Sequence, residues 1–97
     1  MRTIKRFINK NYKVYFFMKD EDTCRRFYQE ADAEGITFGG DKPTEKEPTD
    51  IIALLPEGEI CYVGWAGHRC YYNCKEGVIR IDYEKYANGD QEYLIEK

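Results

Sequence analysis

The spacing of apolar and polar positions along the 97 residues predicts one amphipathic helix and several short strands. The helix is predicted over 20–34, because apolar residues recur there at the three- and four-residue spacing of a helix face. Acidic residues at 20–22 supply an N-cap and a first turn that suits the positive end of the helix dipole. Gly35 follows as the residue that ends a helix with a positive φ. The predicted apolar face consists of Cys24, Phe27, Tyr28 and Ala31.

Strands are predicted where β-branched and aromatic residues alternate between two faces. The segment 12–18 is apolar on both faces, which predicts a central strand. The tail leaves two alternatives, a hairpin around Asn88-Gly89 or a short helical turn over 82–86 that Gly89 closes, and we favour the helical turn. The other predicted strands are 36–38, 51–55, 60–64, 69–73 and 78–83, with a tight turn around Pro56 and Gly58 between 51–55 and 60–64.

These elements predict an α+β fold for a single domain over residues 1–97. We expect an antiparallel β-meander sheet of four to six strands with one amphipathic helix packed on one face. One helix covers only one face, so we expect the other face to be open to water or to a partner. The domain also has a basic N-terminal segment, 1–11, and a long polar loop, 39–49. A loop of this length is uncommon without a function or disorder, so we expect a functional or a mobile element.

The composition is that of a folded, soluble domain, since 42% of the residues are hydrophobic and 34% are charged. No apolar run is as long as a membrane span, and four cysteines are too few for a disulfide-knotted secreted domain. The N-terminus is basic, but the apolar stretch of a signal peptide does not follow it. We therefore expect a cytoplasmic protein with no membrane contact, whose cysteines are thiols.

Charge is unevenly distributed along the chain, although the net charge is only −3. Residues 1–19 contain six basic and no acidic side chains, whereas residues 20–59 contain twelve acidic and four basic ones. A chain of this kind can present an acidic surface to a basic partner, and Glu45, Glu47 and Asp50 are the predicted carboxylates of that surface. The alternative is that the charge serves only solubility.

The aromatic content exceeds what a core of this size needs, with nine tyrosines, five phenylalanines and one tryptophan. Tyrosine and tryptophan provide a large contact area at low conformational cost, so interfaces favour them. We predict that Tyr62, Trp65, Tyr71 and Tyr72 bind a partner together with the carboxylates. The alternative is that these side chains only cover the open face of the sheet.

Cysteine and histidine gather in one short stretch, at Cys61, His68, Cys70 and Cys74. Thiolates and imidazole suit zinc, but the stretch has no Cys-x-x-Cys pair. A Cys–His pair here has no recognisable third group to orient a nucleophile. We predict no metal, no cofactor and no enzyme activity, and we keep a metal-linked structural module as a third hypothesis.

The segment 64–69 (GWAGHR) combines small residues with a base and a cation, a composition that can hold an anion. It lacks the Gly-Lys-Ser/Thr ending of a phosphate-binding loop, and an ordinary turn also needs small residues. An alternative function is therefore a sponge that sequesters a nucleotide signal, a cyclic nucleotide or an ADP-ribose derivative. Trp65, His68 and Arg69 would bind it, at the interface of a homo-oligomer because one small domain has little room for a deep pocket.

The runs 37–45 (TFGGDKPTE), 50–53 (DIIA), 62–68 (YVGWAGH) and 79–83 (IRIDY) resemble small hypothetical proteins of phages and mobile elements of Firmicutes. The resemblance covers about 12–86 and includes no catalytic signature. Proteins of this size and origin are often anti-defence factors. The resemblance implies a phage-encoded, anti-CRISPR-like inhibitor that acts in the host cytoplasm by binding an immune effector such as a CRISPR nuclease.

Overall fold

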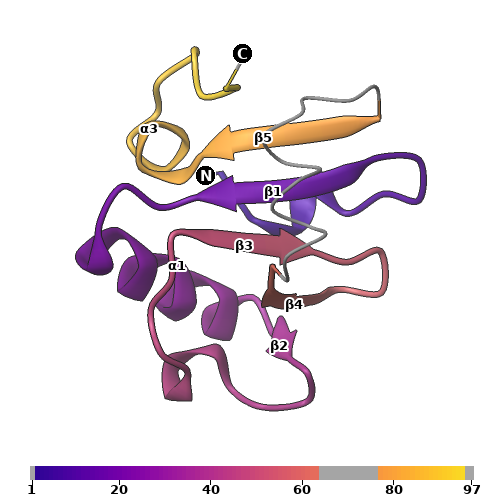
Figure 1. Cartoon of the computed structure of the whole chain (residues 1–97), viewed down its shortest axis with the longest axis vertical. Helices are drawn as coiled ribbons and strands as arrows, with labels where there is room; N and C mark the ends of the chain where they lie inside the picture. The colour runs from indigo at the N-terminus through magenta and orange to yellow at the C-terminus, as the bar shows by residue number, and fades with distance from the viewer. Residues whose placement is uncertain (1, 64–76, 96–97) are drawn as a thin grey trace.

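The computed structural model describes residues 2–63 and 77–95. Its strands lie side by side in one sheet, with α1 beside the sheet and α3 at the end of the last strand (Figure 1). In chain order the elements are the 3-10 helix η1 (Lys5–Phe7), β1 (Lys13–Phe17), α1 (Glu21–Ala33), β2 (Thr37–Phe38), the 3-10 helix η2 (Pro43–Glu45), β3 (Ile51–Leu54), β4 (Glu59–Tyr62), β5 (Val78–Asp82) and α3 (Tyr83–Ala87).

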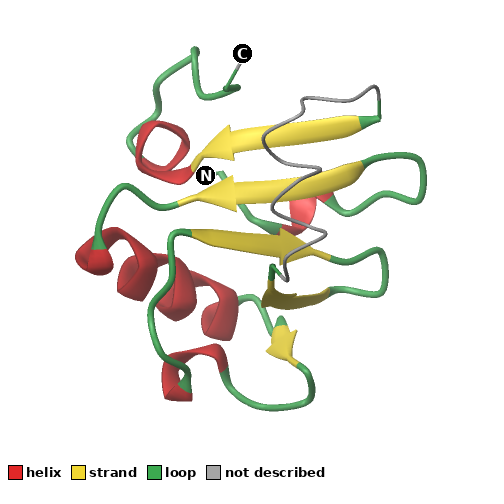
Figure 2. Cartoon of the chain, viewed as in Figure 1, coloured by secondary structure: helices red, strands yellow, loops and turns green. Residues whose placement is uncertain are grey.

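The five described strands form a mixed sheet in the order β2-β4-β3-β1-β5 (Figure 2). β3 pairs antiparallel with β1 and with β4, whereas β1–β5 and β2–β4 are parallel pairs. The α+β class is confirmed, and so is the predicted hairpin, which is β3–β4. The prediction of a purely antiparallel meander is wrong. The predicted strand at 69–73 lies outside the described residues.

The sheet departs from a meander because its first strand, β1, lies at an interior position. Val14 and Phe16 face one side of the sheet, Tyr15 faces the other, and all three are buried. A strand that is apolar on both faces loses the most water contact when strands flank it on both sides. β5 is the described strand that flanks β1 on the side away from β3, and it is parallel to β1, so the pair needs a crossover connection. The apolar pattern of β1 predicts its interior position, but it does not predict which strands flank it.

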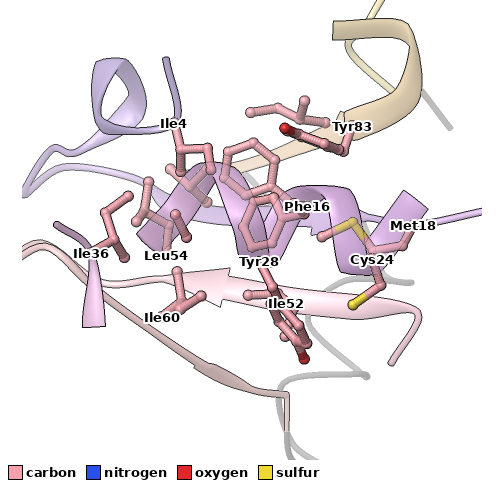
Figure 3. Packing of buried hydrophobic residues seen from close by; sticks show 14 of the residues in the cluster. Ile4, Phe16, Met18, Cys24, Tyr28, Ile36, Ile52, Leu54, Ile60 and Tyr83 are labelled. Atoms are coloured by element: carbon pink, nitrogen blue, oxygen red, sulfur yellow. The ribbon is translucent and has the colours of Figure 1, made fainter. Parts of the chain in front are cut away.

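α1 packs on one face of the sheet and buries the predicted stripe, since Cys24, Phe27, Tyr28 and Ala31 are each at most 1% exposed. Figure 3 shows Cys24 and Tyr28 close to side chains of β1 and β3. Tyr83 and Tyr86 of α3 belong to the same cluster, so the sheet has two helices on this face, of which only α1 is long. The cluster consists of Ile4, Val14, Phe16, Met18, Cys24, Phe27, Tyr28, Ala31, Ile36, Phe38, Ile52, Leu54, Ile60, Ile81, Tyr83 and Tyr86.

The opposite face of the sheet carries a second, smaller apolar cluster. Tyr15 and Ile51 are only 5% and 1% exposed there, and Phe17, Ala53 and Val78 are among the residues packed against them. The expectation that this face is open therefore does not hold at these positions.

The basic N-terminal segment is part of the fold rather than a free extension. Its first turn is tied to the end of α1, because the carboxylate of Glu34 accepts hydrogen bonds from the backbone N–H groups of Ile4 and Lys5, each at 2.8 Å. The ring of Phe7 then lies edge-on to Phe16 and Tyr86.

The tail contains the favoured helical turn, and the hairpin alternative is wrong. α3 begins after Asp82, whose side chain accepts a hydrogen bond from the N–H of Lys85 at 3.3 Å. Gly89 follows with a φ of 87°, the left-handed conformation that ends a helix. The chain then returns to β5, where Leu94 bridges to Ile81.

The N-cap of α1 supplies a test of this architecture. Asp20 accepts hydrogen bonds from the hydroxyl and the backbone N–H of Thr23, at 2.7 and 2.8 Å, and these lower the pKa of Asp20 below the ordinary value of 3.8. A carboxyl whose pKa is lowered on folding stabilises the protein above its unfolded pKa, and this contribution is lost as pH falls through the folded pKa. We expect Asp20→Ala to lower the thermal midpoint at pH 7, and the gap to wild type to narrow below pH 3.8.

The matched control is Asp22→Ala, since Asp22 is an exposed acid of the same first turn. Circular dichroism melts of the three proteins across pH 3–7 make the measurement. An Asp20→Ala protein that melts with the Asp22→Ala protein at every pH would show that the cap does not stabilise the helix.

Candidate functional site

Residues 41–50, here called the strap, connect β2 to β3 alongside α1 (Figure 1). The backbones of Phe38 and Asp41 exchange hydrogen bonds of 2.8 and 3.1 Å, and this tight turn starts the strap. Pro43 begins η2 and is buried, and the hydroxyl of Thr44 donates to the carboxylate of Asp32 on α1. The long polar loop predicted at 39–49 therefore contains a turn of 3-10 helix that is fastened to α1.

The second half of the strap is held by two tyrosine hydroxyls. Tyr28 of α1 and Tyr62 of β4 each donate a hydrogen bond of 2.8 Å to the backbone carbonyl of Glu47. Burial raises the pKa of Tyr28, so its hydroxyl keeps the proton that it donates. The backbone of Glu47 is thus fixed from two elements while its side chain stays exposed.

The last residues of the strap join it to the core and to β1. The N–H of Thr49 donates to Sγ of Cys24 at 3.4 Å, and the carbonyl of Asp50 accepts from the N–H of Met18 at 2.7 Å. This second bond continues the β1–β3 pairing by one step beyond Phe17 and Ile51. The whole strap is therefore positioned by the helix and the sheet.

The three predicted carboxylates, Glu45, Glu47 and Asp50, are all exposed on the strap. Their side chains form no hydrogen bond or salt bridge within residues 2–63 and 77–95. Asp50 lies with Asp20 and Glu21 around a shallow hollow of about 210 Å³ between the start of α1 and the strap. The structure therefore brings Asp50 next to the acidic first turn of α1.

Several cations near this surface are already paired with other acids. Lys19 bonds to Glu84 at 2.7 Å, and Lys46 bonds to Asp41 at 2.9 Å. These bonds raise the pKa of both lysines, so both carry a positive charge at neutral pH. These two lysines form no salt bridge with Glu45, Glu47 or Asp50.

Tyr62 is the one predicted aromatic partner-binding residue that lies within the described residues. Its side chain is 44% exposed, and its ring lies edge-on to Phe38 with 4.7 Å between the ring centroids. Phe38 thus holds the ring of Tyr62, and the hydrogen bond from its hydroxyl to the carbonyl of Glu47 places Tyr62 beside the strap. Trp65, Tyr71 and Tyr72 lie outside the described residues, as do His68 and Arg69 of the nucleotide alternative, and these stay predictions.

The described cysteines are Cys24, which is buried, and Cys61, which is partly buried, and both are free thiols as predicted. Burial raises the pKa of each thiol, and Glu57 and Glu59 raise that of Cys61 further. Residues 2–63 and 77–95 contain no group of three or more metal-binding side chains. His68, Cys70 and Cys74 lie outside this part of the chain.

The pattern of the sequence did not reveal that Asp20 and Glu21 share a surface with Asp50. The sequence predicts the acidic run at 20–22 as the start of a helix and places it in an acidic region, 20–50, that would face a basic partner, but it does not predict which of these acids lie close together. Its proximity to Asp50 follows from the β1–β3 register, which places Phe17 opposite Ile51. The local pattern of a single sequence does not predict this strand pairing.

Neither helix in the described part of the chain combines the length and the apolar character needed to cross a membrane. Comparisons of the chain with protein-family models, with curated proteins and with solved structures gave no match. The resemblance to phage proteins therefore stays a prediction.

Tyr28 and Tyr62 donate to the same carbonyl of Glu47, so we expect their contributions to holding the strap to be coupled. We expect Tyr28→Phe or Tyr62→Phe alone to have a small effect, about 1 kcal/mol or less, because the other hydroxyl still bonds to the carbonyl. The double variant loses both bonds, so its strap should open more than the sum of the single effects predicts. Limited trypsin digestion at Lys46 measures this opening, and urea unfolding measures global stability. Strictly additive cleavage rates would contradict the coupling.

Proposed function

We propose that the chain is a non-enzymatic binding protein that presents the strap and Tyr62 to a basic surface of a partner protein. The observation that carries the proposal is the set of three exposed carboxylates, Glu45, Glu47 and Asp50, which form no salt bridge in the described part of the chain. The backbones of Glu47 and Asp50 are hydrogen-bonded to Tyr28, Tyr62 and Met18. Glu45 follows Thr44, whose side chain bonds to Asp32 of α1.

Fixed geometry is what distinguishes this acidic surface from an ordinary solvated loop. Association costs free energy when loops and side chains become ordered, and a segment that is already held avoids much of this cost. The strap is held by hydrogen bonds from Thr44, Tyr28 and Tyr62 before any partner arrives. This supports a role in binding, because carboxylates that project from a fixed backbone can match a fixed arrangement of cations.

Tyr62 supplies the apolar contact that charges alone lack. Exposed acids at the rim of an interface mainly set the encounter rate and the choice of partner, whereas buried aromatic side chains carry much of the affinity. Tyr62 has an exposed ring that already packs against Phe38. An aromatic anchor beside unpaired carboxylates fits a partner with an apolar depression surrounded by lysines or arginines.

The class of partner that we propose is a host defence protein, such as a CRISPR nuclease. Nucleases bind the phosphate backbone through basic surfaces, and an acidic protein surface fits such a site by charge. The sequence resemblance to phage proteins supports the same class. In this proposal the protein is phage-encoded and acts in the host cytoplasm, where it inhibits the effector by occupying that surface.

The proposal predicts a strong dependence on the strap charges. We expect the wild-type chain to inhibit DNA cleavage by an RNA-guided nuclease from a Firmicutes host, and its binding to weaken as salt rises from 50 to 300 mM. Reversing two charges, with Glu47→Lys and Asp50→Lys together, should weaken binding by about tenfold or more at low salt. Calorimetry and a cleavage assay give the two readouts.

The matched control is Glu57→Lys with Glu92→Lys, which changes the net charge equally at exposed residues outside the strap. This variant should bind like wild type. Equal weakening by both double variants would mean that only net charge matters. Binding that neither salt nor Glu47→Lys/Asp50→Lys changes would refute the role of the strap.

A further inference from the structure

A second site lies away from the strap, between α1, α3 and the N-terminal segment. The chain forms a pocket of about 350 Å³ there, a volume in the range of small-molecule sites. None of Glu45, Glu47 and Asp50 lines it, so it is independent of the proposed partner surface. The polar residues that matter in its lining are Arg2, Arg26, Glu30, Tyr83 and Asn88.

Tyr83 is the feature that points to a ligand. Only 3% of its surface is exposed, and its ring packs edge-on against Phe27 with 5.0 Å between the ring centroids. Its hydroxyl forms no hydrogen bond with residues 2–63 or 77–95, yet no fully buried side-chain polar atom in this part of the chain lacks a partner. The hydroxyl therefore keeps its accessible surface, and the pocket that Tyr83 lines is where that surface opens.

The hydroxyl of Tyr83 is a hydrogen-bond donor over the whole physiological range. Burial raises its pKa, and the nearby carboxylate of Glu30 raises it further. Figure 3 shows Tyr83 at the margin of the buried cluster, near Phe16. The hydroxyl therefore faces the pocket as a donor that is open to an acceptor from solvent or from a ligand.

Two guanidinium groups give the pocket its charge. Arg26 donates to the side-chain oxygen of Asn88 at 3.1 Å, which holds the arginine across from α3. Arg2 donates to the carbonyls of Tyr86 and Asp90 at 3.1 and 2.7 Å, and its guanidinium lies 5.1 Å from the ring centroid of Tyr86. The lining also contains one carboxylate, that of Glu30. Two guanidinium groups and one carboxylate give the lining a net positive charge.

We propose that this pocket binds a small oxyanion that also carries a hydrogen-bond donor. The phenol of Tyr83 and the guanidinium of Arg26 would donate to the anionic oxygens, and the carboxylate of Glu30 would accept from the donor. Phosphate monoanion and hydroxycarboxylates share this chemistry. A ligand with several negative charges and no donor is disfavoured by Glu30, which gives the site selectivity.

Titration followed by nuclear magnetic resonance tests the proposal in the full chain. Sodium phosphate at pH 6 and sodium lactate are added in separate series, with chloride keeping the ionic strength constant. Saturable shifts of the backbone amides of Asn88 and Gly89 are expected with at least one of the two anions. Saturation with phosphate alone or with lactate alone supports the site and identifies which oxyanion it prefers.

Variants then assign the site to its residues. Tyr83→Phe removes only a hydroxyl that has no hydrogen-bond partner among the described residues, so the ligand-free melting temperature should stay close to that of wild type. Tyr83→Phe and Arg26→Gln should each weaken the binding of the anion by about tenfold or more, because each removes a hydrogen bond to a charged group. Arg25→Gln is the control, since Arg25 is exposed on the same helix and lies near Glu21, away from this pocket.

Shifts that do not saturate with either anion would overturn the proposal. So would saturable binding that retains wild-type affinity in both Tyr83→Phe and Arg26→Gln. A loss of affinity in Arg25→Gln equal to that in Arg26→Gln would equally refute it, because it would reduce the effect to net charge.

Discussion

The packing of the apolar stripe of α1 against β1 is the interaction on which the rest of the structure depends. Phe16, Phe27 and Ile52 are each 0% exposed where the helix meets the sheet. Burying one such side chain contributes roughly 1.5–3 kcal/mol, so this layer supplies much of the driving force for folding. It also fixes the helix over the sheet, and the helix in turn carries Tyr28 and Asp32, which hold the strap.

Local pattern predicted the elements well. The helix is observed as Glu21–Ala33, close to the predicted range. It is specified by features only a few residues apart: the N-cap Asp20, the apolar stripe that follows it, and Gly35 at the end. The same is true of the hairpin β3–β4, whose turn includes Gly58 with a φ of 88°. Short-range physics of this kind can be inferred from the order of residues alone.

Long-range pairing could not be inferred in this way. Val14 and Phe16 indicate that β1 is buried, but nothing in them indicates that Ile79 and Ile81 of the last strand lie beside them in parallel. The same limit applies to the candidate site. Glu47 and Asp50 could be identified as exposed acids, whereas their attachment to Tyr28 and to Met18 depends on tertiary contacts. The pocket around Tyr83 was missed for this reason as well, because its lining comes from three distant segments.

The position of β1 between β3 and β5 has a consequence for how the protein is made. On the ribosome the interior strand is synthesised first, but one of its two edges has no partner until residues 78–82 have left the exit tunnel. During that interval the nascent chain exposes the backbone N–H and carbonyl groups of an apolar strand, which is a template for pairing with other chains. The pairing of β5 with β1 covers this edge, so it also protects the chain from such aggregation.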